Sequence, residues 1–354
     1  MTHPKASPSA NAFSADVLVV GAGPAGLFQV FELGLLGLSS LVVDALPQAG
    51  GQLKALYPDK PIYDVPALRH CTGQELVDRL LDQIQPFETQ WALGRKVQGF
   101  SEWMAGSEPG WQVVLDDGQS HRVRALVIAA GVGAFVHRQI DCADLAPARG
   151  RSVLSLYALE AASLQGRKVV VAGSGDEAVA CALRAQSLGA ATVHLLHRRD
   201  DLDTSDASAA QTLKQAGVSR LTGQITQAKL GADSSLQSLC IARAGHAELW
   251  QGADVLIECL GLVPQLGPLA EWGLAMHKKQ IEVATDTFST SLPGVYAIGD
   301  MAHYAGKRKL LVSAFHEATL AAYAVAERLN GGPVPFEYTT ASARLQARLG
   351  VITS

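Results

Sequence analysis

The stretch that most constrains the fold covers residues 17–44 and reads VLVVGAGPAGLFQVFELGLLGLSSLVVD. A short apolar run leads into a glycine-rich turn, an apolar-periodic segment follows, and a second apolar run ends on an acid. This order predicts a strand, a turn, a helix and a strand, which together form the opening unit of a doubly wound nucleotide-binding fold. The turn residues expected to face a ligand are Gly21, Gly23, Pro24, Ala25 and Gly26.

Each glycine of this turn has a separate physical role. Gly21 permits the tight turn, Gly23 lets the backbone approach a pyrophosphate, and Gly26 lets helix and strand pack closely. The helix N-terminus offers unpaired N–H groups and the positive end of its dipole to the phosphates. Asp44 comes 23 residues after Gly21 and is placed to accept hydrogen bonds from an adenosine ribose. The stretch therefore predicts a dinucleotide site.

Residues 168–199 repeat this plan. An apolar run at 169–171 is followed by GSGDEA at 173–178, a helical segment to about Leu188, and a second apolar run at 192–196. An internal repeat of this kind predicts two mononucleotide-type folds and hence two nucleotide sites in an α/β chain. The second turn contributes the candidate binding residues Gly173, Gly175 and Asp176.

The two copies differ at the end of their second strand. The first ends on Asp44, whereas the second has His197, Arg198 and Arg199. A carboxylate repels a 2′-phosphate, and arginine makes charge-assisted contacts with one. We therefore expect the first site to bind FAD and the second NADPH. The alternative for the two arginines is a solvated charge cluster.

Composition excludes several classes of protein. The chain has 354 residues, 48% of them hydrophobic, which suffices for two or three domains with substantial cores. The formal net charge of −4 gives no global reason to expect nucleic acid. The most apolar region, residues 26–43, is interrupted by Gln29 and Glu32 and is not read as a membrane span. Residues 1–14 predict a disordered tail rather than a signal peptide, so we expect a cytoplasmic protein.

The cysteines and histidines indicate no metal or dithiol centre. The five cysteines are far apart and form no CxxC pair, and no histidine stands at HxxxH or HExxH spacing from another ligand. An odd number of cysteines fits reduced, buried thiols. We assign no metal site and no catalytic side chain.

Other patterns predict the elements between and after the two turns. Residues 72–85 form a helix with a capping box between Thr72 and Glu75, and residues 111–128 form a hairpin that turns at 116–118. Further strands are expected at 236–242 and 253–259, and a long helix at 311–329. The run PGVYAIGD ends on Asp300, which we expect to accept a hydrogen bond from a ribityl hydroxyl; the alternative is an ordinary turn.

The combination of motifs resembles the ferredoxin-NADP reductases of the thioredoxin-reductase-like type over about residues 16–350. Besides the two glycine turns, the motifs are GGQL, YPDK followed by IYDV, AAGVGAF, HRR, LGPLAEWGL, PGVYAIGD, and YAGKRKLL followed by HEA. The resemblance implies two Rossmann-like, three-layer domains, the second inserted into the first, in a homodimer. The implied FAD domain covers residues 15–140 and 264–354, and the NADPH domain covers 141–263.

The same resemblance implies a set of flavin contacts. Tyr57 is expected to stack on one flavin face, and Tyr338, in a C-terminal extension, to cover the other. The alternatives are a loop packing residue for Tyr57 and a mobile tail for Tyr338. The remaining contacts implied by position are Asp44, Gln52, Val97, Phe135, Asp300 and Thr340.

Three departures from the family pattern bear on function. No cysteine occurs in residues 151–166, where thioredoxin reductases carry CxxC, so electrons are not expected to pass to a disulfide there. The usual Phe-Arg-Ala after HRR is replaced by DDLDT at 200–204, which should weaken 2′-phosphate binding. His316 replaces glycine in the usual GFGEA motif.

We expect an enzyme that transfers hydride from NADPH to FAD and then single electrons to ferredoxin or flavodoxin. A basic group could steer such an acidic partner. Its members are Lys307, Arg308 and Lys309, with Arg344 and Arg348. The alternatives are a flavoprotein that reduces a quinone, oxygen, another flavoprotein or a small disulfide, and a nucleotide-occupied sensor.

Overall fold

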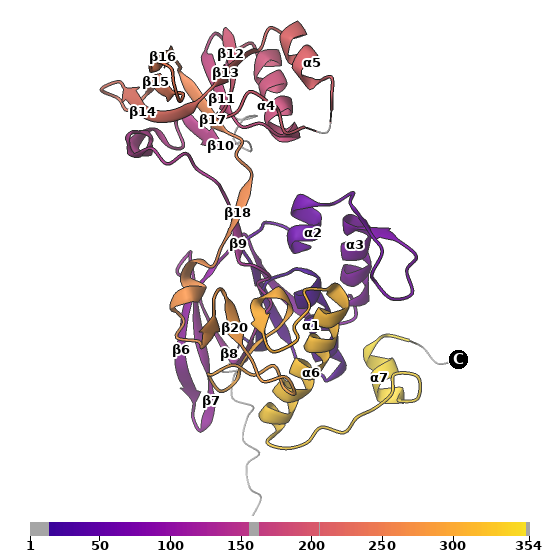
Figure 1. The fold of residues 1–354 in the computed structure, drawn as a ribbon. Coiled ribbons are helices and arrows are strands. Elements are labelled where there is room, and N and C mark those ends of the chain that lie inside the picture. The colour runs from indigo at the N-terminus through magenta and orange to yellow at the C-terminus, as the bar shows by residue number, and fades with distance from the viewer. Residues whose placement is uncertain (1–13, 156–162, 205, 352–354) are drawn as a thin grey trace, which may run out of the picture. The chain divides into compact units, whose positions relative to one another are not determined.

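The computed structural model describes residues 14–155, 163–204 and 206–351 (Figure 1). The chain forms two compact units: unit 1 consists of Met1–Ala134 and Gln265–Ser354, and unit 2 of Phe135–Pro264. Unit 2 is therefore inserted in the sequence of unit 1. The family resemblance implies chain crossings after residues 140 and 263, whereas the compact units of the structure divide after residues 134 and 264. The expected tail at 1–14 lies, apart from Ser14, outside the described residues.

Unit 1 is built on a seven-stranded sheet in the order β5-β2-β1-β8-β7-β6, with β21 also paired to β8. Strands β5, β2, β1, β8 and β21 are mutually parallel, whereas β8, β7 and β6 form an antiparallel meander. The strands are β1 (Ala15–Val20), β2 (Ser40–Asp44), β5 (Thr89–Leu93), β6 (Val97–Ala105), β7 (Glu108–Leu115), β8 (Ser120–Ile128) and β21 (Val295–Ala297). The hairpin predicted at 111–128 is thus confirmed as β7 and β8.

Alternate strand residues of unit 1 form two separate cores, as expected for a sheet covered on both faces. Val17, Val19 and Val127 pack under helices α1, α3 and α6. Leu18, Leu126 and Ile128 pack on the opposite face with apolar residues of β6 and β7. The helices of this unit are α1 (Pro24–Leu35), α2 (Gly51–Leu56), α3 (Gly73–Gln83), α6 (Leu311–Asn330) and α7 (Ala343–Arg348).

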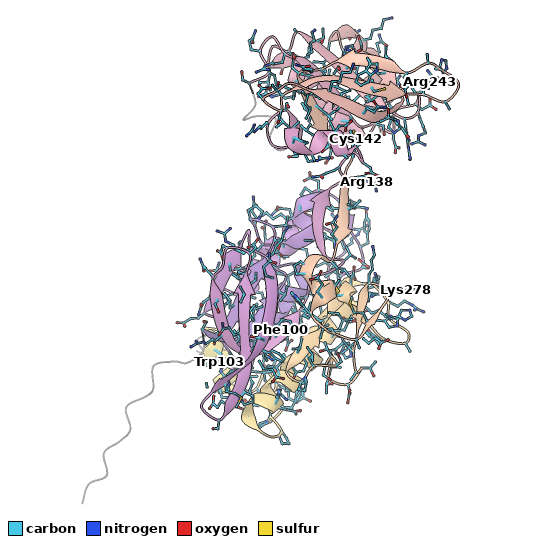
Figure 2. All side chains as sticks on the ribbon, turned by 90° about the vertical axis from the view of Figure 1, so that its left-hand side faces the viewer. Phe100, Trp103, Arg138, Cys142, Arg243 and Lys278 are labelled. Carbon is cyan, nitrogen blue, oxygen red and sulfur yellow. The ribbon has the colours of Figure 1, made fainter. Side chains whose placement is uncertain are left out.

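Local signals fixed several of these elements. The Thr72 hydroxyl accepts a hydrogen bond from the Glu75 N–H at 3.1 Å, and the Glu75 carboxylate accepts one from the Thr72 N–H at 2.8 Å, which confirms the capping box. Phe100 lies on β6 (Figure 2). Its ring makes edge contacts with Trp111 and Trp272, at 5.0 and 5.2 Å between ring centroids. The short elements of unit 1 are β3 (Pro61–Ile62), β4 (Cys71–Thr72), η3 (Gly267–Glu271), β19 (Met276–His277), β20 (Gln280–Glu282), η4 (Gly299–Met301) and β22 (Ala302–His303).

Unit 2 has a five-stranded parallel sheet in the order β10-β17-β11-β12-β13. Helices α4 and α5 cover one face, and a small antiparallel sheet, β14-β15-β16, covers the other together with η1. The elements are η1 (Ala143–Ala148), β10 (Val153–Ser155), β11 (Lys168–Ala172), α4 (Asp176–Ser187), β12 (Thr192–His197), α5 (Ala209–Gln215), β13 (Ser219–Thr222), β14 (Gln224–Leu230), β15 (Leu236–Ala242), β16 (Leu249–Gly252) and β17 (Val255–Glu258). The predicted repeat of strand, turn, helix and strand is confirmed in β11, α4 and β12.

The two chain crossings between the units pair with each other. Strand β9 (Ala134–His137) leaves unit 1, strand β18 (Leu262–Gln265) returns to it, and the two form a two-stranded sheet. Among the described residues, no helix is both long and apolar enough to cross a membrane.

Candidate nucleotide-binding sites

The first glycine turn contains two positions where a side chain does not fit. Gly21 has a φ of +109°, and a Cβ there would lie 2.4 Å from the Ala129 carbonyl oxygen. A Cβ on Gly26 would lie 1.9 Å from the Gly21 carbonyl oxygen, so α1 packs directly on the turn. These contacts confirm the tight turn at Gly21 and the close packing at Gly26.

Gly23 differs because its Cβ position is open. The nearest atom to a Cβ there is the Gly51 Cα at 4.0 Å. Gly23 is also the N-cap of α1, without a side-chain hydrogen bond to the first turn, and Pro24 follows at the helix start. A glycine with an open Cβ position at an uncapped helix N-terminus fits a phosphate-bearing ligand, for which such termini are suited.

Asp44 lies at the end of β2 beside this turn. Its two carboxylate oxygens accept hydrogen bonds from the N–H groups of Ala22, at 2.6 Å, and Leu46, at 2.7 Å. Burial raises the pKa of Asp44 above its ordinary value of 3.8, and the two hydrogen bonds partly offset that effect. Because a carboxylate has about four acceptor positions, Asp44 keeps capacity for ribose hydroxyls.

The N-terminus of α6 lies at the same end of unit 1 as that of α1. The tilted rings of Phe28 and Phe315 lie 4.9 Å apart between centroids, and one turn later along both helices Thr319 donates a hydrogen bond to Glu32 at 3.2 Å. The matching order of these contacts shows that the two helices run parallel. Both positive dipole ends therefore face the same region of unit 1.

The turn that carries Asp300 meets α1 in this region. A Cβ on Gly299 would lie 3.3 Å from the Ala25 Cβ, and the Gly299 φ is +70°. The Asp300 carbonyl accepts a hydrogen bond from Gln280 Nε2 at 2.9 Å. The turn that carries Asp300 therefore lies next to the first turn of α1, which contains Ala25.

A buried ionic network, which the motif analysis did not identify as functional, supports the Asp300 turn. Glu317 of α6 has no exposed surface, and it accepts hydrogen bonds from the Gly299 N–H at 2.7 Å and the Tyr304 hydroxyl at 2.8 Å. Its third partner is the ammonium of Lys307, whose side chain is only 7% exposed. Burial, together with the bond to Glu317, raises the pKa of Tyr304 to about 12.

This network corrects the expected basic patch. Lys307 is committed to Glu317 and is not part of an exposed group. Arg344 pairs with Glu337, and Arg348 donates to the Leu35 carbonyl. Arg308 and Lys309 remain exposed at the surface before α6.

Two further candidates lie near the first turn. A Cβ on Gly131 would lie 3.0 Å from Gln52 Nε2, so the Gln52 side chain faces the end of β8. Tyr57 is partly exposed, and the Lys60 ammonium lies 4.9 Å from its ring centroid. The Tyr57 ring is therefore accessible at the surface of unit 1.

The remaining candidates are more widely spread. Val97 is the first residue of β6, and its side chain is buried in the core of unit 1. Only the main chain of Val97 is therefore available to a ligand. Phe135 lies in β9, and its side chain is outside what the structure describes. Thr340 is exposed in the segment after α6.

Tyr338 is 68% exposed and contacts Phe336 at 4.9 Å between centroids. Phe336 in turn lies 6.1 Å from Tyr323, which stands twelve residues after the start of α6, or about 18 Å along the helix. These contacts place Tyr338 beside the C-terminal half of α6. Within one copy of the chain, Tyr338 therefore lies away from Asp300, which is at the N-terminal end of that helix.

The second glycine turn, in unit 2, is tightly packed. A Cβ on Gly173 would lie 2.3 Å from the Cys259 carbonyl oxygen and 2.7 Å from the Ala178 Cβ. Gly175, the N-cap of α4, has the Asp203 carbonyl 3.5 Å from its Cβ position. Asp176 accepts a hydrogen bond from Thr204. The segment that replaces Phe-Arg-Ala therefore folds against this turn.

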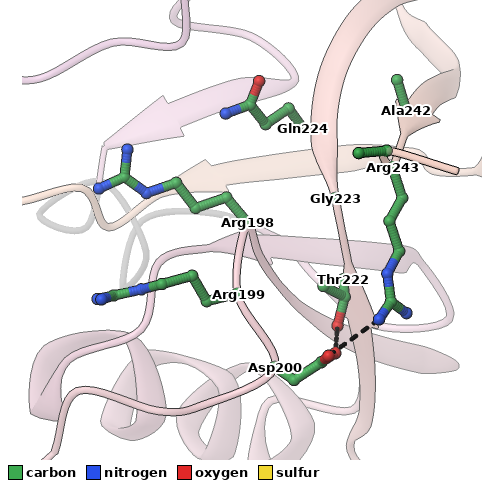
Figure 3. Close-up of a pocket in the computed structure, with 9 residues that line it drawn as sticks. Arg198, Arg199, Asp200, Thr222, Gly223, Gln224, Ala242 and Arg243 are labelled. Atoms are coloured by element: carbon green, nitrogen blue, oxygen red, sulfur yellow. Dashed lines mark hydrogen bonds and ion pairs between the residues drawn. The ribbon is translucent and has the colours of Figure 1, made fainter.

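Arg198 and Arg199 line a pocket of about 370 Å³ at the end of β12 (Figure 3). The other residues that line it are Asp200, Thr222, Gly223, Gln224, Ala242, Arg243 and Ala244. Within the described part of the chain, neither Arg198 nor Arg199 has a carboxylate partner. Arg243, directly after β15, also lines the pocket and forms an ion pair with Asp200; no sequence motif marked it.

Comparisons with known proteins agree with this architecture. The family model for pyridine nucleotide-disulphide oxidoreductases matches residues 15–325. A ferredoxin–NADP reductase of Acidovorax sp. (strain JS42) is 46% identical, with 99% of each chain covered. A second ferredoxin–NADP reductase, from Mesorhizobium japonicum, is 39% identical, with 96% of this chain and 98% of that protein covered.

Solved structures of similar fold include thioredoxin reductases. That of Lactococcus lactis has a TM-score of 0.56 at 20% identity and covers 90% of this chain and 100% of its own. That of Gloeobacter violaceus has a TM-score of 0.53 at 25% identity and covers 92% and 98%. The fold is therefore the predicted one, α/β with two Rossmann-like domains. The chain belongs to the pyridine nucleotide-disulphide oxidoreductase family and groups there with proteins named ferredoxin–NADP reductase.

Proposed function

We propose that this protein is a ferredoxin–NADP reductase that binds FAD in unit 1 and NADPH in unit 2. The observation that carries the proposal is the opposite charge beside the two glycine turns, Asp44 at the first and Arg198 with Arg199 at the second. The names of relatives at 39–46% identity support the same activity.

In unit 1, Gly23 and the start of α1 would hold the pyrophosphate of FAD, and Asp44 the adenosine ribose. Asp300, Gln52, Tyr57 and the main chain of Val97 would contact the rest of the cofactor. Bound FAD would supply acceptance of hydride from NADPH and release of electrons one at a time.

In unit 2, Gly173, Gly175 and Asp176 lie at the turn where the NADPH pyrophosphate would bind. Arg198 and Arg199 would make charge-assisted contacts with the 2′-phosphate, which NADH lacks. These two side chains would therefore set the preference between the two nucleotides.

We further propose that the electron acceptor is an acidic ferredoxin or flavodoxin and that Arg308 and Lys309 steer it. Both side chains are exposed directly before the N-terminus of α6. A homodimer in a reducing, cytoplasmic compartment completes the proposal. The exposed Tyr338 and the free thiols of all five cysteines support it.

The test is an anaerobic titration of the purified protein with NADPH and, separately, NADH, followed by oxidised ferredoxin or flavodoxin. We expect a flavin absorbance spectrum that NADPH bleaches at lower concentration than NADH, and rapid reoxidation by the carrier that slows at high salt. A protein without flavin would overturn the proposal, as would reduced flavin that quinone or oxygen reoxidises but neither carrier does.

A further inference from the structure

Asp200 directly follows the two arginines of the unit 2 pocket. A carboxylate at this position should repel a phosphate dianion and weaken its binding. The sequence alone therefore predicts weakened binding of the 2′-phosphate, although NADPH is still the expected nucleotide. The structure changes that expectation because it shows where the carboxylate lies.

Three residues of unit 2 hold Asp200. Its carboxylate accepts a hydrogen bond from the Thr222 hydroxyl at 2.6 Å and forms an ion pair with the Arg243 guanidinium at 2.9 Å. The Asp200 main-chain carbonyl accepts a hydrogen bond from Arg220. The bond from Thr222 is the main reason why the pKa of Asp200 lies below its ordinary value, and Arg243 adds to it.

Figure 3 shows how these contacts orient the charges. The Asp200 carboxylate points toward Thr222 and Arg243, and the side chains of Arg198 and Arg199 extend away from it. The guanidinium groups of this arginine pair are thus left without a carboxylate partner among the described residues.

We propose that Arg243, acting through Asp200, determines the specificity of this pocket for a 2′-phosphate. Arg243 neutralises the charge of the Asp200 carboxylate, and together with Thr222 it keeps that carboxylate turned from Arg198 and Arg199. Arg243 is then a positioning residue rather than a phosphate ligand. The proposal rests on the proposed function of unit 2 as the NADPH site. On this proposal, a chain with DDLDT after its arginines still binds NADPH in preference to NADH.

The test compares two probes that differ by the 2′-phosphate, 2′,5′-ADP and 5′-AMP, by calorimetry on the full-length protein. We expect Arg243→Gln to weaken 2′,5′-ADP binding by about threefold to tenfold, the size expected for an exposed charge a few ångströms from a phosphate. Binding of 5′-AMP should not change. The double variant Arg243→Gln with Asp200→Asn should recover the binding of 2′,5′-ADP.

Arg151→Gln serves as the matched control, because it removes one positive charge from unit 2 at a residue that does not line the pocket. It should leave both dissociation constants unchanged, and the melting temperatures of all variants report on folding. A double variant that stays as weak as Arg243→Gln would overturn the proposal in favour of direct contact between Arg243 and the phosphate. An unaltered 2′,5′-ADP affinity in Arg243→Gln would also overturn it.

The two proposals fail in different ways. If the unaltered protein binds 5′-AMP and 2′,5′-ADP equally and no variant changes the ratio, the specificity role of Arg243 is wrong while the nucleotide site stands. If the unaltered protein binds neither probe, the proposed function of unit 2 is wrong, and the inference about Arg243 fails with it.

Discussion

At the scale of single residues, the glycines of the first turn separate structural from binding roles. Gly26 has the main-chain oxygen of Gly21 where its Cβ would be, so glycine is required there by the fold itself. Gly23 has only one atom near its Cβ position, at 4.0 Å, so the fold alone tolerates a methyl group there. If Gly23 is kept for a ligand, the two substitutions should behave differently.

We predict that Gly26→Ala lowers the free energy of unfolding of the flavin-free protein by about 2–4 kcal/mol, because helix α1 must move off the turn. Gly23→Ala should change it by less than about 0.5 kcal/mol, yet weaken FAD binding at least about tenfold. Urea unfolding of the flavin-free protein and fluorescence titration with FAD measure the two quantities.

Gly332→Ala is a suitable control, since no atom lies within 4 Å of its Cβ position and it stands outside both turns. It should leave both stability and FAD affinity as they are. Undiminished FAD binding in Gly23→Ala would contradict the pyrophosphate role of that residue.

Residue spacing predicted these turns because their geometry is local. Gly21, Gly26 and Asp44 belong to one strand-helix-strand unit, whose hydrogen bonds and packing follow from the order of the chain. Arg243 could not be predicted in the same way. Its partner Asp200 is 43 residues earlier, and the two meet only through the pairing of strands across unit 2.

At the scale of secondary-structure elements, the buried pair of Glu317 and Lys307 joins helix α6 to the loop before it and to the Asp300 turn. Two charges removed from water are stable only with close partners, and Glu317 has three. The run of Lys307, Arg308 and Lys309 predicts an exposed basic group. Burial of one member depends on tertiary packing that the run itself does not encode.

We predict that Glu317→Gln lowers the free energy of unfolding by about 3–5 kcal/mol, because it leaves the Lys307 ammonium buried without a counter-charge. The double variant Glu317→Gln with Lys307→Met should lose less than the sum of the two single changes, with a coupling of about 1–3 kcal/mol. Chemical denaturation of the four proteins in the cycle gives the coupling directly.

Arg95→Met with Asp117→Asn provides the comparison, since both side chains of this pair are partly exposed on the surface of unit 1. Its coupling should stay below about 1 kcal/mol. Additive effects at Glu317 and Lys307 would mean that the two buried charges do not stabilise each other.

At the scale of the whole molecule, unit 2 is continuous in sequence whereas unit 1 is made of two segments. Unit 2 has its own apolar cores on both faces of its sheet. The internal repeat predicted the two folds, and the family resemblance supplied the insertion of one into the other. The repeat alone does not show that residues 265–354 return to the first domain. That return depends on the pairing of β21 with β8, two strands that are separated in the sequence by all of unit 2.

We therefore predict that a fragment of residues 135–264 folds in isolation, since it carries complete cores and all five strands of its parallel sheet. It should unfold cooperatively and give dispersed amide signals in a two-dimensional NMR spectrum. The matched fragment 1–134 lacks β21 and α6 and should give collapsed or aggregated material. A fragment 135–264 with random-coil spectra would contradict the independence of unit 2.

The pairing of β9 with β18 has a consequence for how the protein is made. During synthesis, residues 1–134 emerge first but cannot complete their sheet until β21 follows, after the whole of unit 2 has been synthesised. Once unit 2 has folded, its paired ends hold the two halves of unit 1 close together. The folded inserted domain then acts as a short tether between the two segments of unit 1. Bringing these segments together costs the entropy of closing a loop of a few residues rather than one as long as unit 2.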